Sequence, residues 1–142
     1  MGLFDRKSVD SFDRICWRIS GMRSIRDYEI VRKGESAELA EYERYYREGK
    51  DERRLLRRGS CPAEQILELL NACAVLKWDG FHGKHPRGVK DGEMMSFEAE
   101  VNEGVTIKAS GSENFPKHFG DFRREVNGLL KPVEEGSGEE GQ

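Results

Sequence analysis

The chain has 142 residues, the usual size of one domain, and 36% of them are hydrophobic and 36% charged. Its formal net charge is −3, and the last ten residues hold four glutamates: Glu134, Glu135, Glu139 and Glu140. The rest of the chain is therefore nearly neutral. This balance argues against a function based on nonspecific attraction to nucleic acid or to an anionic membrane.

The cysteines and the hydropathy pattern predict a soluble cytoplasmic protein. Cys16, Cys61 and Cys73 are far apart and form no CxxC pair, which argues against a disulfide framework and a thiolate metal site. The first residues contain no apolar stretch long enough for export, and no run approaches the roughly 18 apolar residues of a membrane span. We therefore expect no contact with a membrane.

The first half of the chain predicts four strands. After a flexible N-terminus (residues 1–10), Ile15, Trp17 and Ile19 alternate with polar residues, and residues 25–33 show a similar pattern. Residues 37–47 fit either a helix or a strand, because helix-favouring residues are mixed with three tyrosines. The turn at 48–51 and the short run at 53–58 favour a hairpin, so we predict strands on both sides of that turn.

The second half predicts a helix, a hairpin and a second helix. From Pro62 onward, apolar residues recur at helical intervals. Strict alternation over 94–101 and 105–109, around a turn ending in Gly104, predicts a hairpin. A second apolar stripe with helical spacing begins near Pro116. Residues 132–142 are too polar to be buried and are expected to form a disordered tail.

These elements predict one α+β domain over residues 11–131. The expected order is β-β-β-β-α-β-β-α, and short connections favour a mainly antiparallel sheet of about six strands with both helices on one face.

A resemblance points to the same fold class. The sequence Trp78-Asp79-Gly80-Phe81, the Asp91-Gly92 loop end, the alternating hairpin and Phe115-Pro116 at the start of the last helix resemble a family of small bacterial proteins. The similarity covers about residues 62–130. It implies a compact α+β domain of bacterial type and no particular activity.

Three histidines are the candidates for a metal site. His82 and His85 lie in the Gly-rich loop, and His118 lies near the start of the last helix, so a small metal-dependent hydrolase is one alternative. The spacing is poor, and Lys84 and Arg87 would repel a cation. Solvated loop histidines are the simpler interpretation. Ser110, Ser112, Cys61 and Cys73 lack a nucleophile motif, so we predict no catalytic residue and no cofactor.

Arginines and aromatic residues are the stronger signal. The candidate binding residues are Tyr42, Tyr45, Tyr46, Arg53, Arg54, Arg57, Arg58, Trp78, Phe81, Lys84, His85, Arg87 and Lys90. Arginines beside exposed aromatic rings can bind nucleic acid, through the basic loop 84–90 and the run 53–58. Glutamates interleaved with the arginines explain the same pattern as cross-strand pairs on a solvated face. Trp78 and Phe81 fit anchors of the loop better than a stacking platform.

The sequence thus favours a non-catalytic interaction or accessory module. A sheet face rich in Arg, Tyr and Glu has the composition of a polar protein interface. The expected partner is another protein, which could be a second copy of the chain, and nucleic-acid binding is the alternative.

Overall fold

The fold is seen in a computed structural model that describes residues 8–21, 24–84 and 92–133. The six long strands are β1 (Phe12–Ser20), β2 (Ile25–Lys33), β3 (Ser36–Arg47), β4 (Lys50–Pro62), β6 (Met94–Val101) and β7 (Val105–Ser112). Two-residue strands β5 (His82–Gly83) and β8 (Lys131–Pro132) flank them. The helices are α1 (Ala63–Ala72), the short 3-10 helix η1 (Val75–Trp78) and α2 (Phe119–Leu129). The predicted α+β class is confirmed.

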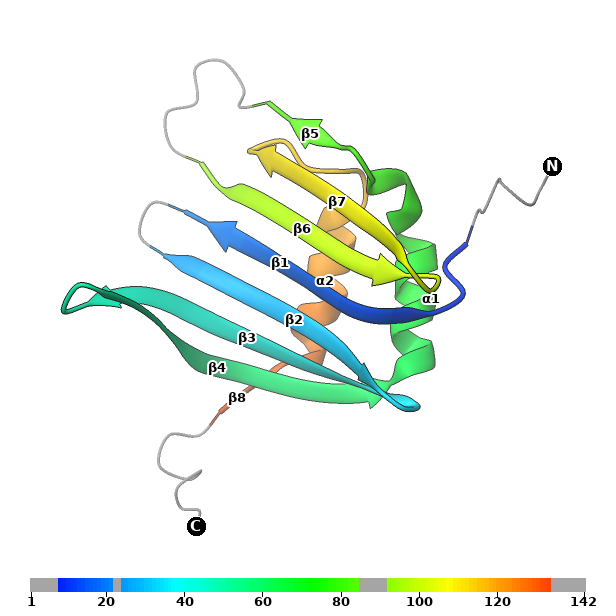
Figure 1. Cartoon of the computed structure of the whole chain (residues 1–142), viewed down its shortest axis with the longest axis horizontal. Coiled ribbons are helices and arrows are strands. Elements are labelled where there is room, and N and C mark those ends of the chain that lie inside the picture. Colours follow the sequence, from blue (N-terminus) through cyan, green and yellow to red (C-terminus); the bar gives the residue numbers. More distant parts are fainter. Residues whose placement is uncertain (1–7, 22–23, 85–91, 134–142) are drawn as a thin grey trace, which may run out of the picture.

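All strands join one sheet in the order β5-β7-β6-β1-β2-β3-β4-β8. Every pairing is antiparallel except that of β5 with β7. The long β3–β4 hairpin settles the ambiguous stretch 37–47 as strand. In Figure 1 both α1 and α2 lie on the same side of the sheet, so the opposite face carries no helix of the described chain.

The core lies between the sheet and the two helices. Phe119, Phe122 and Val126 of α2 are at most 2% exposed, and Phe97 and Ile107 point to the same side of the sheet. Trp78 contacts Phe97, Phe119 and Phe122 through edge-on ring pairs, with centroids 5.0 to 5.7 Å apart. Alternation along the strands thus places one apolar set under the helices.

One cross-strand row on the helix side changes from apolar to polar along its length. The register aligns Ala109, Phe97, Trp17, Tyr28, Glu41 and Arg57 on neighbouring strands from β7 to β4. Trp17 and Tyr28 stack with centroids 5.1 Å apart. Arg57 Nη2 then donates to Asn127 Oδ1 of α2 at 2.8 Å, so the polar end of the row ties the sheet to that helix.

Two local contacts fix the ends of these elements. A side chain at Gly59 would overlap the carbonyl oxygen of Leu129, so the missing Cβ lets the end of α2 approach β4. We expected residues 1–10 to be flexible, yet Val9 is buried and its backbone exchanges hydrogen bonds of 2.7 and 3.1 Å with the Asn71 side chain. None of the described helices is long and apolar enough to cross a membrane.

Candidate functional site

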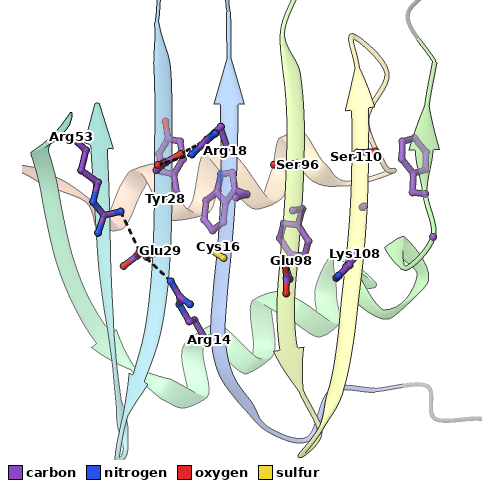
Figure 2. Close-up of a pocket in the computed structure, with 16 residues that line it drawn as sticks. Arg14, Cys16, Arg18, Tyr28, Glu29, Arg53, Ser96, Glu98, Lys108 and Ser110 are labelled. Atoms are coloured by element: carbon purple, nitrogen blue, oxygen red, sulfur yellow. Dashed lines mark hydrogen bonds and ion pairs between the residues drawn. The ribbon is translucent and has the colours of Figure 1, made fainter. Parts of the chain in front are cut away.

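The sheet face opposite the helices, here called the open face, carries the residues that alternate with the core. Its central positions on β1 and β2 are Arg14, Cys16, Arg18, Asp27 and Glu29, and Figure 2 looks onto this part of the face. No described helix covers these side chains, so they can meet a partner molecule.

Two groups of ion pairs, one around Glu29 and one around Asp27, restrain the side chains of the open face. Glu29 Oε2 accepts from Arg14 Nη2 at 3.3 Å and from Arg53 Nη1 at 3.5 Å, as the dashed lines in Figure 2 show. Asp27 accepts from Arg18 Nε at 2.7 Å and from Arg44 Nη1 at 3.2 Å. Each carboxylate on β2 thus links an arginine of β1 to an arginine of the β3–β4 hairpin and restrains their side chains.

The cations of this network are more accessible than its anions. The side chains of Arg14, Arg18 and Arg53 are 50, 45 and 41% exposed, whereas those of Asp27 and Glu29 are 13 and 20% exposed. A partner approaching the centre of the open face therefore meets guanidinium groups first. Because each guanidinium has five N–H donors, the ion pairs leave donors for further acceptors.

An aromatic ring completes the network. The guanidinium of Arg53 lies over the ring of Tyr42, with its Cζ 3.8 Å from the ring centroid. This cation–π contact orients both residues on the open face, and Arg and Tyr are the residue types that most often anchor protein interfaces.

The open face is hollowed in three adjoining places. A central hollow of about 520 Å³ is lined by the network residues on β1 and β2 and by Glu98 and Lys108 on β6 and β7. A second, of about 580 Å³, lies around Tyr42 and Arg58 and shares Glu29 with the first. A third, of about 490 Å³, lies toward β5 and shares Arg18, Ser96 and Ser110 with the central hollow.

Cys16 lies in the central hollow but is a poor nucleophile. Burial raises the pKa of its thiol, and the carboxylates of Glu98 and Glu29 add to this effect, while Arg14 opposes it. The thiolate is the reactive form of cysteine, so the site suppresses that reactivity. Burial also raises the pKa of the Cys61 and Cys73 thiols in the core.

The structure divides the arginine run 53–58 between the two faces of the sheet. Arg53 and Arg58 line hollows of the open face, whereas Arg54 pairs with Glu43 and Arg57 with the buried Glu41. Alternation along β4 separates Arg53 from Arg54, and a β-bulge at Leu56, which has no partner between the Glu41–Arg57 and Tyr42–Leu55 pairs, then reverses the alternation and places Arg57 on the helix side. The run thus makes two separate surfaces.

The tyrosines are divided as well. Tyr42 lines the second open-face hollow, and Tyr45 donates to Glu52 Oε1 at 3.2 Å within the β3–β4 hairpin. Tyr46 is 76% exposed near the hairpin tip. Tyr42 is therefore the tyrosine that the open face holds in place.

Trp78 and Phe81 take the anchoring role that the sequence favoured for them. Trp78 is 2% exposed, and its Nε1 donates to the Lys117 carbonyl at 3.0 Å. Phe81 is half-buried and packs against the same core. Of the candidate basic loop, Lys84 is exposed beside β5, while His85, Arg87 and Lys90 lie outside the described residues.

The histidines that the structure describes do not line a common site. His82 Nδ1 lies 3.0 Å from Ser110 Oγ at the sheet edge, and His118 Nδ1 lies 3.2 Å from Asp121 Oδ2 at the start of α2. The former lines the hollow near β5 and the latter a groove between the helices. His85 is outside the described residues, and within them no three His, Cys, Asp or Glu side chains gather in a possible metal site.

Sequence reasoning missed Glu41, the one charged side chain among the buried residues that the structure describes, at 2% exposure. The signal was present, because Ala37, Leu39 and Glu41 alternate on one face of β3. Sequence reasoning also missed the network residues of β1 and β2, since pairing partners on distant strands cannot be read from one strand alone.

Comparison with known proteins identifies no related protein. No protein-family model matches the chain, and no curated protein or solved structure is significantly similar to it. The resemblance of residues 62–130 to small bacterial proteins therefore stays a prediction.

Proposed function

We propose that the chain is a non-catalytic interaction module that binds another protein across the open face. The observation that carries this proposal is the ordered network of Arg14, Glu29, Arg53 and Tyr42 beside a hollow of about 520 Å³. Arginine and tyrosine, which supply three of its four side chains, are among the residue types enriched at protein interfaces.

Preorganisation is the physical advantage of this arrangement. Ordering a long side chain on binding costs about 0.5 to 1.5 kcal/mol, and the ion pairs already restrain the arginines before a partner arrives. The exposed guanidinium groups suit a partner whose contact surface presents carboxylates and backbone carbonyls. Each such charge-assisted bond is shorter and stronger than a neutral one.

The chemistry of the face supports binding rather than turnover. The pKa of the central thiol, Cys16, is raised by burial, and the nearby carboxylates Asp27 and Glu29 are held in ion pairs. A catalytic acid, base or nucleophile needs a pKa matched to its task and a free reacting position. The raised pKa of Cys16 disfavours its thiolate, and ion pairs with arginines already engage the carboxylates of Asp27 and Glu29.

The test compares an open-face variant with a matched variant on the helix side. The double substitution Arg14→Ala with Arg53→Ala removes two exposed, paired guanidinium groups, and Arg124→Ala removes one on α2 that is 70% exposed and paired with Asp121. Exposed pairs contribute about 1 kcal/mol or less to stability, so we expect all variants to fold.

Wild-type and variant proteins are used as baits in an extract of the native host, and each retained protein is then purified and its dissociation constant measured. We expect a partner whose affinity for the double variant is at least tenfold lower than for the wild type, since interface arginines often contribute more than about 1.4 kcal/mol. Its affinity for Arg124→Ala should be unchanged. Equal affinity for all three baits would show that the open face is not the binding surface. A second copy as partner would appear as a dimer in light scattering that the double variant lacks.

A further inference from the structure

The open face differs chemically at its corner near β5. Four serines gather there, Ser20 on β1, Ser96 on β6, and Ser110 and Ser112 on β7, and we call them the serine patch. They line the hollow of about 490 Å³, together with Arg18, His82 and Lys84. Figure 2 shows Arg18, Ser96 and Ser110 at one level of the sheet, on three neighbouring strands.

No carboxylate is found among the described residues that line this hollow, whereas the central hollow contains Asp27, Glu29 and Glu98. The corner therefore combines hydroxyl donors with three basic side chains, of which Arg18 is paired with Asp27 of the central hollow. A cation would meet no opposite charge among these residues. The chemistry suits an anion.

The His82–Ser110 pair keeps a donor for that anion in either tautomer. The histidine Nδ1 and the serine Oγ are 3.0 Å apart. If Nδ1 carries the proton and donates, the serine O–H can donate to a ligand; if the serine donates, the imidazole proton is on Nε2. A protonated imidazole donates from both nitrogens.

Arg18 supplies donors from the opposite side of the hollow. Its bonds to Asp27 use Nε and Nη2, at 2.7 and 3.3 Å, and so do not use the two N–H groups of Nη1. Lys84 adds an ammonium group with three donors from the β5 side.

We propose that the serine patch binds a phosphomonoester group. Donors around the hollow come from β1, β6, β7 and the β5 segment, so several ligand oxygens can be bound at once from different strands. A phosphate ester offers three acceptor oxygens and a charge of about −1.5 to −2, whereas a carboxylate offers two coplanar oxygens and one charge. This proposal is independent of partner binding across the rest of the open face.

The experiment titrates the full-length chain with small anions and follows backbone amide resonances by NMR at constant ionic strength. The probes are inorganic phosphate, O-phospho-L-serine within a short peptide, and acetate. We expect saturable shifts centred on the strands of the serine patch with both phosphate probes and none with acetate. Tighter binding of the peptide would assign the group to a phosphorylated polypeptide, and equal binding to a free phosphate ion or ester.

Variants test which residues hold the anion. Lys84→Gln and Ser110→Ala should each weaken phosphate binding about tenfold or more, the usual effect of losing one hydrogen bond to a charged group. Lys50→Gln and Ser60→Ala change the same residue types on β4, away from the serine patch, and should leave phosphate binding unchanged. Unchanged binding by Lys84→Gln and Ser110→Ala, or equal shifts with acetate, would overturn the proposal. Well-dispersed spectra of the variants establish that they are folded.

Discussion

The hydroxyl of Tyr28 donates a hydrogen bond of 2.8 Å to Oε2 of Glu41, and both side chains lie on the helix side of the sheet. Arg26 donates to the same oxygen at 3.1 Å, and Arg57 donates to the other carboxylate oxygen. Through Arg57 and Asn127 the cluster reaches α2. An ionised carboxylate therefore joins β2, β3, β4 and a helix beneath the open face.

Replacing Glu41 should be costly. Glu41→Ala leaves the Tyr28 hydroxyl and two guanidinium groups without their shared acceptor, and we expect the free energy of unfolding to fall by about 2 to 3 kcal/mol. Glu98→Ala, at an exposed position of the open face, should change it by less than about 0.5 kcal/mol. Urea unfolding of both variants measures the difference. Equal losses would show that the buried cluster does not stabilise the fold.

Acid should weaken the same cluster. Burial alone would raise the pKa of Glu41, but the hydrogen bonds from Arg57 and Tyr28 outweigh burial and hold that pKa below its usual value of 4.5. A carboxyl with a lowered pKa stabilises the folded state above its unfolded pKa, and this stabilisation is lost as pH falls through the folded pKa. The stability difference between wild type and Glu41→Gln should therefore shrink below about pH 4.5. A constant difference down to acid unfolding would contradict this account.

Alkaline titration should detect the ionisation of Tyr28, the donor of the hydrogen bond to Glu41. Burial, and then the bond to Glu41, raise the pKa of Tyr28 to about 12 from 10.0. Because the neutral phenol is favoured in the folded state, its stabilisation is complete below pH 10 and is lost between pH 10 and about 12. Ultraviolet absorbance should show a phenol ionising near pH 12 in the wild type, and Tyr28→Phe should remove that step. A curve that Tyr28→Phe leaves unchanged above pH 11 would refute the assignment.

Two glycines should respond to alanine with opposite signs. Gly59→Ala places a methyl group against the Leu129 carbonyl, a clash with backbone that should cost about 1 to 3 kcal/mol. Gly128→Ala meets nothing within 4 Å and adds helix propensity to α2, so it should stabilise by about 0.5 kcal/mol. Thermal unfolding midpoints compare the two, and a neutral Gly59→Ala would mean that the close approach is not required.

The sequence predicted the long elements because their periodicity is local. Met95, Phe97 and Ala99 alternate on β6, and Phe119, Phe122 and Val126 recur with helical spacing on α2, as the structure confirms. The two-residue strands β5 and β8 were missed because two residues carry no period. The hairpin at residues 36–62 was predicted only because its turn outweighed a helical composition.

The candidate site was harder to predict because it depends on register between strands. The arginine run looked like one surface, but the bulge at Leu56 of β4 sends Arg57 to the helix side, whereas Arg53 lies on the open face. Glu29 joins Arg14 and Arg53 only because β1, β2 and the β3–β4 hairpin lie side by side. Neither the bulge nor the pairing of these strands can be predicted from a single segment of the sequence.

Cys16 provides a probe at the centre of the open face. Its thiol pKa is raised by burial and by the nearby carboxylates, so labelling by iodoacetamide should be slower than that of an unhindered thiol. Glu98→Gln removes one of those carboxylates, lowers the thiol pKa and should speed labelling at pH 8. A slower reaction in Glu98→Gln would contradict the electrostatic assignment.

The most direct test of protein binding across the open face is the labelling rate of Cys16 with and without a purified partner. Glu68→Cys provides a reference thiol on the exposed side of α1, and Cys61 and Cys73 are buried. We predict that the partner slows the labelling of Cys16 at least tenfold and leaves the reference thiol unchanged. Unchanged labelling of Cys16, with protection of the reference thiol instead, would place the interface on the helix side and contradict the proposal.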